Sequence, residues 1–166
     1  MIALKHILVA TDFGEASDAA LAYGRELART FGAALEVVHV IDDLNVRFGE
    51  YPSYPALGRL QSESDAAART RLNALLSEED RQALRARAVV LISTSPAEAI
   101  ASYATDAMPR IGMIVVGTHG RGRMAHLLMG SVAERVVRIA PCPVLTVRHP
   151  QHEFVLPDAL QTVARA

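Results

Sequence analysis

Residues 113–131 read MIVVGTHGRGRMAHLLMGS, and three features follow one another in this stretch. Met113 to Val116 is an apolar run that predicts a buried strand. Gly117 to Gly130 is rich in glycine and arginine, which predicts a loop that turns tightly. Ser131 then begins a predicted helix as its N-cap, with Glu134 in the capping-box position. A strand that passes through a glycine loop into a helix is typical of parallel α/β folds.

The same alternation of strands and helices extends over the rest of the chain. Its strands are nearly all apolar, as expected for strands buried on both faces of a parallel sheet. Ser17, Ser77 and Ser95 are predicted helix N-caps, and Gly32 a helix C-terminus. Residues 42–55 predict a long loop. The expected strands are 7–10, 35–41, 88–93, 113–116 and 144–147, and the expected helices are 17–31, 57–76, 78–85, 95–108 and 131–140. We therefore expect an α/β fold, an open five-stranded parallel sheet with helices on both faces.

Composition excludes several classes of function. The chain has 166 residues, about one domain, and its net charge of −1 argues against a nucleic-acid binder. Lys5 is the only lysine among 17 basic residues, so a Walker-type loop and a Schiff-base lysine elsewhere are not expected. Cys142 is the only cysteine, which excludes an internal disulfide, and we expect it to be a small buried residue. The sequence shows no signal peptide or membrane-length apolar run, so we expect a cytoplasmic protein without a membrane partner.

Two segments are candidates for ligand binding. Ligands of open α/β sheets bind beyond the carboxyl ends of the strands, where Thr11-Asp12 and the Gly117 loop are predicted to lie. Backbone amides of a glycine loop and of a helix start can hold an anion, and Arg121 adds positive charge. The alternative is a surface loop in which Ser131 merely caps a helix.

The spacing Gly117-x2-Gly120-x9-Gly130-Ser131 resembles the nucleotide-binding signature of the universal stress protein (UspA-like) superfamily. The resemblance extends over residues 5–148 and includes the opening HILVATD that ends at Asp12. It implies a Rossmann-like sheet of the adenine nucleotide α-hydrolase-like kind, with strand order 3-2-1-4-5. The family domain would occupy residues 1–149. Residues 150–166 would form a tail, with a short helix at a dimer contact as one option.

The resemblance also implies a set of site residues. Thr11 and Asp12 would lie by the nucleoside, Asp12 toward the ribose or a phosphate-bound Mg²⁺, which is the one metal contact expected. The backbone of Val40 would meet adenine, and the residues from Gly130 to Ala133 would hold the phosphates. The full expected nucleotide-binding set is Ala10, Thr11, Asp12, Val40, Gly117, Thr118, His119, Gly120, Arg121, Gly122, Gly130, Ser131, Val132 and Ala133.

The function implied is that of a regulatory module in stress response that binds ATP with Mg²⁺, or AMP. Members of the family with a single domain dimerise through the last strand, here Val144–Val147. No general base stands beside a nucleophile in the sequence, so no catalytic residue is predicted. Two alternatives stay open: a slow ATP hydrolase or autophosphorylating protein on the same fold, and a stress protein that only makes protein contacts.

Overall fold

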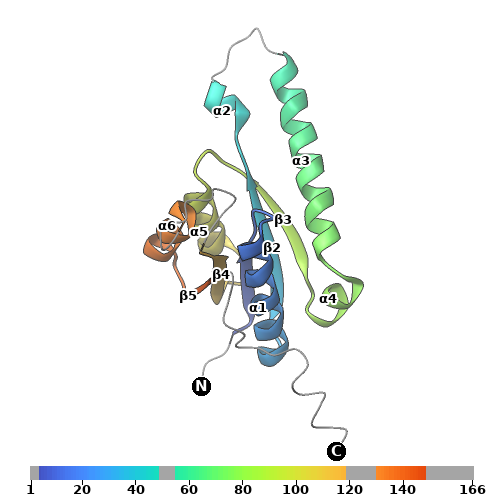
Figure 1. The fold of residues 1–166 in the computed structure, drawn as a ribbon, viewed down its shortest axis with the longest axis vertical. Helices are drawn as coiled ribbons and strands as arrows, with labels where there is room; N and C mark the ends of the chain where they lie inside the picture. Colours follow the sequence, from blue (N-terminus) through green and yellow to red (C-terminus); the bar gives the residue numbers. More distant parts are fainter. Residues whose placement is uncertain (1–3, 49–54, 119–129, 149–166) are drawn as a thin grey trace, which may run out of the picture.

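The computed structural model describes residues 4–48, 55–118 and 130–148, and these form a central sheet flanked by helices (Figure 1). The expected tail, residues 150–166, lies outside the described residues. The strands are β1 (His6–Ala10), β2 (Ala34–Ile41), β3 (Arg87–Ile92), β4 (Met113–Gly117) and β5 (Val144–Val147). Every pairing is parallel and the order is β3-β2-β1-β4-β5, which confirms the predicted sheet.

The helices occupy the connections between the strands. They are α1 (Glu15–Phe31), α2 (Leu44–Phe48), α3 (Pro55–Leu75), α4 (Glu78–Ala83), α5 (Pro96–Asp106) and α6 (Ser131–Ile139). In the described part of the chain, none of them combines the length and the apolar character needed to cross a membrane.

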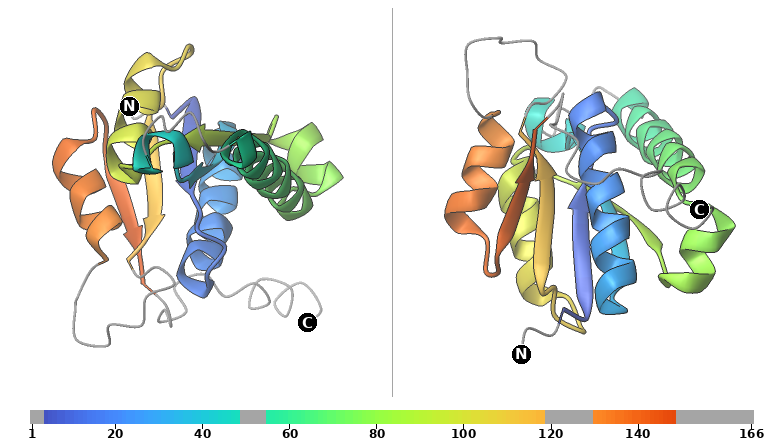
Figure 2. Two further views of the ribbon diagram at one scale, coloured as in Figure 1. Left: turned by 90° about the horizontal axis from the view of Figure 1, so that it is seen from above. Right: turned by 60° about the horizontal axis from the view of Figure 1, so that its bottom comes forward.

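Helices cover both faces of the sheet. Alternate residues of each strand point to opposite faces, so each strand contributes side chains to both. Ile7 and Val9 of β1 belong to an apolar cluster that includes residues of α1 and α3. Leu8, between them, belongs to a second cluster with residues of α5 and α6. The left panel of Figure 2, seen from above, shows helices on both sides of the sheet. This two-sided burial explains the nearly uniform apolar strands.

Two helices have glycine N-caps in place of the predicted serine caps. The N-cap of α1 is Gly14, and Ser17 is the third helical residue, so the prediction of Ser17 as N-cap was wrong. Its hydroxyl accepts a hydrogen bond from the Gly14 amide at 3.1 Å and donates one to the Gly14 carbonyl at 2.8 Å. The N-cap of α6 is Gly130, so Ser131 is its first helical residue and not its cap. In both helices the cap position itself has no side chain.

The other predicted helix ends had mixed outcomes. Ser77 caps α4 as expected, and Gly32 ends α1 in the left-handed conformation. Ser95 is the N-cap of α5 but makes no side-chain capping hydrogen bond. Glu98 pairs instead with Arg135 of α6 at 2.5 Å, which links the two helices on that face of the sheet.

The segment predicted as one long loop contains α2. Asp43 caps this helix through its Oδ1 atom, which accepts hydrogen bonds from the amides of Asn45 and Val46, both at 3.0 Å. Asp42 forms an ion pair with Arg47 at 2.6 Å. The two acidic side chains therefore stabilise a local turn of helix, which hydrophobic periodicity over five residues could not reveal.

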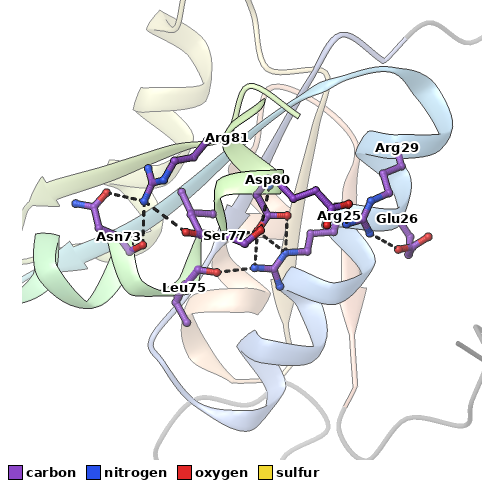
Figure 3. A network of polar contacts seen from close by, with 10 residues as sticks. Arg25, Glu26, Arg29, Asn73, Leu75, Ser77, Asp80 and Arg81 are labelled. Carbon is purple, nitrogen blue, oxygen red and sulfur yellow. Dashed lines mark hydrogen bonds and ion pairs between the residues drawn. The ribbon is translucent and has the colours of Figure 1, made fainter. Parts of the chain in front are cut away.

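One buried ion pair joins three elements at the amino end of the sheet (Figure 3). Asp80 of α4 is 2% exposed, and its carboxylate accepts hydrogen bonds from Arg25 of α1 at 2.9–3.1 Å. Arg25 also donates to the carbonyl of Leu75 at the end of α3, at 2.5 Å. Burial alone would raise the pKa of Asp80, but hydrogen bonds from Arg25 and Ser77 outweigh it and lower that pKa.

We predict that Asp80→Asn lowers the free energy of unfolding by about 3 kcal/mol at pH 7, because Arg25 loses its buried partner. Asp80 has a lowered pKa in the folded state, so its stabilising effect is present above the ordinary carboxyl pKa. It is lost as the pH falls through that value toward the folded pKa. Urea unfolding at pH 7 and at pH 3 should therefore show a large difference between wild type and variant at pH 7 and a smaller one at pH 3.

Glu26→Gln serves as the matched control, since Glu26 forms an exposed ion pair with Arg29 on the same helix. This control should change stability by less than about 1 kcal/mol at either pH. An equal loss for Asp80→Asn at both pH values would show that the charge of Asp80 is not what stabilises the junction.

Candidate functional site

The carboxyl ends of β1, β2 and β4 lie at one edge of the sheet. Ala10, the last residue of β1, lies opposite Val38 of β2 and Val116 of β4. Thr11 continues this pairing, because its amide donates to the Val38 carbonyl at 2.9 Å. The sheet register therefore places the Thr11-Asp12 turn beside the exit of β4, as the general rule for ligand sites in such sheets requires.

The exit of β4 also touches the beginning of α1. A methyl group added at Gly117 would lie 2.6 Å from the carbonyl carbon of Ala16 and 2.7 Å from its carbonyl oxygen. Only a residue without Cβ allows the two backbones to come this close. Gly117 thus brings the end of β4 against the helix that follows the Thr11-Asp12 turn.

A backbone hydrogen bond connects the exit of β4 to the beginning of α6. The amide of Gly130 donates to the carbonyl of Thr118, and the amide of Thr118 donates to Val147 of β5 at 2.7 Å. The first amide of α6 with a partner inside the helix is that of Glu134, which donates to Gly130 at 3.0 Å. The amides before it form the positive end of the helix dipole, an arrangement suited to an anion.

The turn after β1 contributes a carboxylate and a hydroxyl. Thr11 is 6% exposed, and its Oγ1 lies 3.0 Å from the Oγ of Ser17. Asp12 is half-buried, and its Oδ1 accepts a hydrogen bond from the Gly14 amide at 3.1 Å. A carboxylate at this position can accept hydrogen bonds from sugar hydroxyls or coordinate a cation that arrives with a phosphate.

Small apolar side chains lie at the same edge. Ala133 of α6 is buried in the apolar cluster on the α5–α6 side of the sheet, and Ala10 and Val40 pack against that cluster, each half-buried. Apolar atoms that stay partly exposed beside polar backbone groups can accept a flat ring on one side and hydrogen-bond its edge on the other.

The predicted site residues fall into two groups. The described ones share the carboxyl edge of the sheet or the beginning of α6; they are Ala10, Thr11, Asp12, Val40, Gly117, Thr118, Gly130, Ser131, Val132 and Ala133. His119, Gly120, Arg121 and Gly122 lie outside the described residues. Sequence reasoning missed the contact of Ser17 with the site: its hydroxyl bonds to that of Thr11 besides bonding to the backbone of Gly14. The sequence feature that could have indicated the bonds to Gly14 is the spacing of Ser17 three residues after Gly14, which is the spacing of a capping box.

Metal and thiol chemistry have little support in the described residues. In residues 4–48, 55–118 and 130–148, no group of three or more His, Cys, Asp or Glu side chains could hold a metal ion. Cys142 is half-buried rather than fully buried, and burial raises the pKa of its thiol. Its thiol therefore stays protonated near neutral pH, which does not favour nucleophilic chemistry.

The fold and the candidate site together define a parallel α/β protein whose candidate ligand site lies at the carboxyl ends of its strands. The universal stress protein family model matches residues 3–148, and the chain belongs to this family. A universal stress protein of Thermus aquaticus is 34% identical over 144 residues, which cover 87% of this chain and 98% of that protein.

Solved structures show the same fold. UspA of Lactobacillus plantarum has a TM-score of 0.70 and 26% identity, over 89% of this chain and all of that one. A universal stress protein of Archaeoglobus fulgidus, solved in complex with dAMP, has a TM-score of 0.60 and 23% identity, over 89% of this chain and 99% of that one.

We predict that Gly117→Ala lowers the free energy of unfolding by about 2 kcal/mol, because the new methyl group collides with the backbone of Ala16. Chemical unfolding of both proteins would measure the difference. Gly58→Ala is the matched control: Gly58 lies in α3 with nothing within 4 Å of an added Cβ, and alanine favours a helix. A Gly117→Ala variant as stable as Gly58→Ala would contradict the close approach.

Proposed function

We propose that this chain is a cytoplasmic regulatory module of the stress response that binds an adenine nucleotide, ATP with Mg²⁺ or AMP. The observation that carries the proposal is the hydrogen bond from Gly130 to Thr118, because it puts the amides at the beginning of α6 beside the exit of β4. The dAMP bound by the Archaeoglobus fulgidus relative supports the choice of an adenine nucleotide.

In this proposal each part of the site binds one part of the nucleotide. Adenine lies against Ala10 and meets the backbone of Val40, and the residues from Gly130 to Ala133 hold the phosphates. Asp12, beside Thr11, binds the ribose, or the Mg²⁺ that accompanies ATP. Mg²⁺ would supply positive charge that lets a carboxylate and a phosphate chain share one site.

The phosphates are held by backbone amides and arginine rather than by lysine. Lys5, the only lysine, directly precedes β1 and so lies at the opposite edge of the sheet from the carboxyl ends. Gly117 and Thr118 on one side, and Gly130, Ser131 and Val132 on the other, supply the backbone for this part of the site. His119, Gly120, Arg121 and Gly122 complete it in the proposal.

We predict that the wild-type protein binds AMP and ATP and that Gly130→Val loses most of this affinity. The valine side chain would occupy the space through which a phosphate approaches the α6 amides. The backbone of Gly130 is extended, with φ −68° and ψ 150°, and accepts valine without strain, so the fold should survive. Isothermal titration calorimetry with each nucleotide measures affinity, and thermal unfolding checks the fold.

Gly58→Val is the matched control, since it makes the same change at an exposed position of α3. It should bind as the wild type does. For the wild type, AMP at about 100 times its dissociation constant should add about 2.7 kcal/mol of stability. If neither nucleotide gives a heat of binding or stabilises the protein, the alternative function, a stress protein that only makes protein contacts, is favoured.

A separate measurement tests whether turnover accompanies binding. If the site only binds and signals, release of ADP or AMP from ATP should be far slower than about 1 per second, a rate in the ordinary enzyme range. Turnover at or above that rate would favour a hydrolase, and label transferred from ATP to the protein would favour autophosphorylation, with Ser131 as a candidate acceptor.

We also propose that two copies pair through Val144–Val147. β5 is an outer strand of the sheet, and Val137 and Ile139 of the adjacent α6 are 45% and 39% exposed. Two outer strands related by a two-fold axis would satisfy each other's backbone groups and cover these side chains. Residues 150–166, after a domain of residues 1–149, would pack on this dimer.

Sedimentation equilibrium should therefore give the mass of two chains. Thr146→Pro removes a backbone donor in the middle of β5 and should shift the protein toward single chains. The control is Val46→Ala, which removes an exposed apolar side chain of α2, away from β5. A proline at this position would disrupt the helix, so alanine is used. A wild type that sediments as one chain would exclude the dimer.

A further inference from the structure

Phe13, the residue after the Thr11-Asp12 turn, has a left-handed backbone. Its φ is +62°, a conformation that is costly for a residue with a large side chain. Its amide donates to the Oγ1 of Thr11 at 2.9 Å. This backbone hydrogen bond does not involve the ring, so the surroundings of the ring also bear on whether this conformation persists.

The ring of Phe13 is held between two elements that are distant in sequence. Its centroid lies 4.5 Å from that of His39 on β2, with the ring planes at 51°. On α3, the guanidinium carbon of Arg71 lies 3.9 Å from the Phe13 centroid, a cation–π contact. The turn after β1 is thus supported by β2 and by α3.

His39 also contacts the turn directly. Its Nδ1 lies 2.7 Å from the carbonyl oxygen of Thr11. A carbonyl oxygen only accepts hydrogen bonds, so Nδ1 carries the proton and donates it. The Thr11 amide donates to Val38 at 2.9 Å, so both backbone polar groups of Thr11 are bound by neighbouring residues of β2.

Binding of the Thr11 carbonyl determines the orientation of the next peptide group. The carbonyl of Thr11 and the amide of Asp12 belong to one rigid plane. Rotation of that plane would break the hydrogen bond from His39 and would redirect the backbone that carries the Asp12 carboxylate. The position of this carboxylate therefore depends on the imidazole of a neighbouring strand.

We propose that His39 is a positioning residue for nucleotide binding: its Nδ1 holds the Thr11–Asp12 peptide in the orientation that presents Asp12 to the ligand, and the Phe13–Arg71 stack keeps the imidazole in place. This inference rests on the proposed function, and it assigns to His39 no contact with the nucleotide. It predicts that affinity depends on a donor at the Nδ1 position rather than on imidazole as such.

Two substitutions separate the hydrogen bond from the bulk of the side chain. His39→Leu keeps an apolar side chain against Phe13 but removes the donor. His39→Asn keeps a donor near the Nδ1 position. In calorimetry with AMP, well below the melting temperature of each protein, His39→Leu should raise the dissociation constant about tenfold, the effect of losing one good hydrogen bond. His39→Asn should stay within about twofold of wild type.

Arg71→Gln tests the outer part of the stack. Arg71 is exposed on α3, so this variant should fold, and it should raise the dissociation constant for AMP about threefold. Arg69→Gln is the matched control, because Arg69 lies on the same helix and pairs with Asp65. It should bind AMP as the wild type does.

Hydrogen exchange of the amides from Asp12 to Gly14, measured without nucleotide, supplies a readout independent of the ligand. Exchange should be faster in His39→Leu and unchanged in His39→Asn. If the wild type binds AMP and both His39 variants bind it as tightly as the wild type does, the positioning role is wrong while the proposed function stands. If the wild type binds no AMP, the proposed function fails and the role in binding fails with it. Faster exchange in His39→Leu alone would then show that His39 orders the turn and nothing more.

Discussion

The close approach of two backbones, Gly117 at the end of β4 and Ala16 in the first turn of α1, is the constraint on which the site depends. β4 lies beside β1 in the sheet, and α1 follows β1 after a short turn. With a side chain at Gly117, α1 would move away from the sheet and the turn before it would move too. The absence of one Cβ therefore sets the spacing between the turn that carries Asp12 and the exit of β4.

The carboxyl edge of the sheet carries groups of opposite electrostatic preference. Backbone amides at the beginning of α6 favour an anion, whereas Asp12 favours hydroxyl groups or a cation. A ligand with hydroxyl groups next to phosphates satisfies both requirements, and a nucleotide is such a ligand. A lone inorganic anion would satisfy only the α6 side and would be repelled by Asp12. The arrangement thus favours a sugar phosphate over a simple ion.

Two buried acidic residues away from the site hold the framework together. Asp80 joins α4 to α1 through Arg25, and Glu36 of β2 accepts hydrogen bonds from Arg87 at 2.6 Å and from Tyr103 at 2.5 Å. Burial, together with the hydrogen bond to Glu36, raises the pKa of Tyr103 to about 12. Tyr103 therefore stays a neutral donor across the physiological range. The Asp80 pair connects two helices, and Glu36 connects α5 and β3 to β2, at positions where an unpaired charge would be costly.

Much of this protein was determined by its sequence alone. Apolar strands and their alternation with helices predicted the parallel sheet, and the glycine spacing from Gly117 to Gly130 indicated where a ligand site is expected, because periodicity and turn chemistry are local properties. The N-caps Gly14 and Gly130 were assigned to serines instead, since a glycine cap leaves no side-chain signal. Only the tertiary structure decided which distant groups meet. The hydrogen bond from His39 to Thr11 and the pairing of Arg25 with Asp80 span 28 and 55 residues, and such contacts depend on packing that no local pattern encodes.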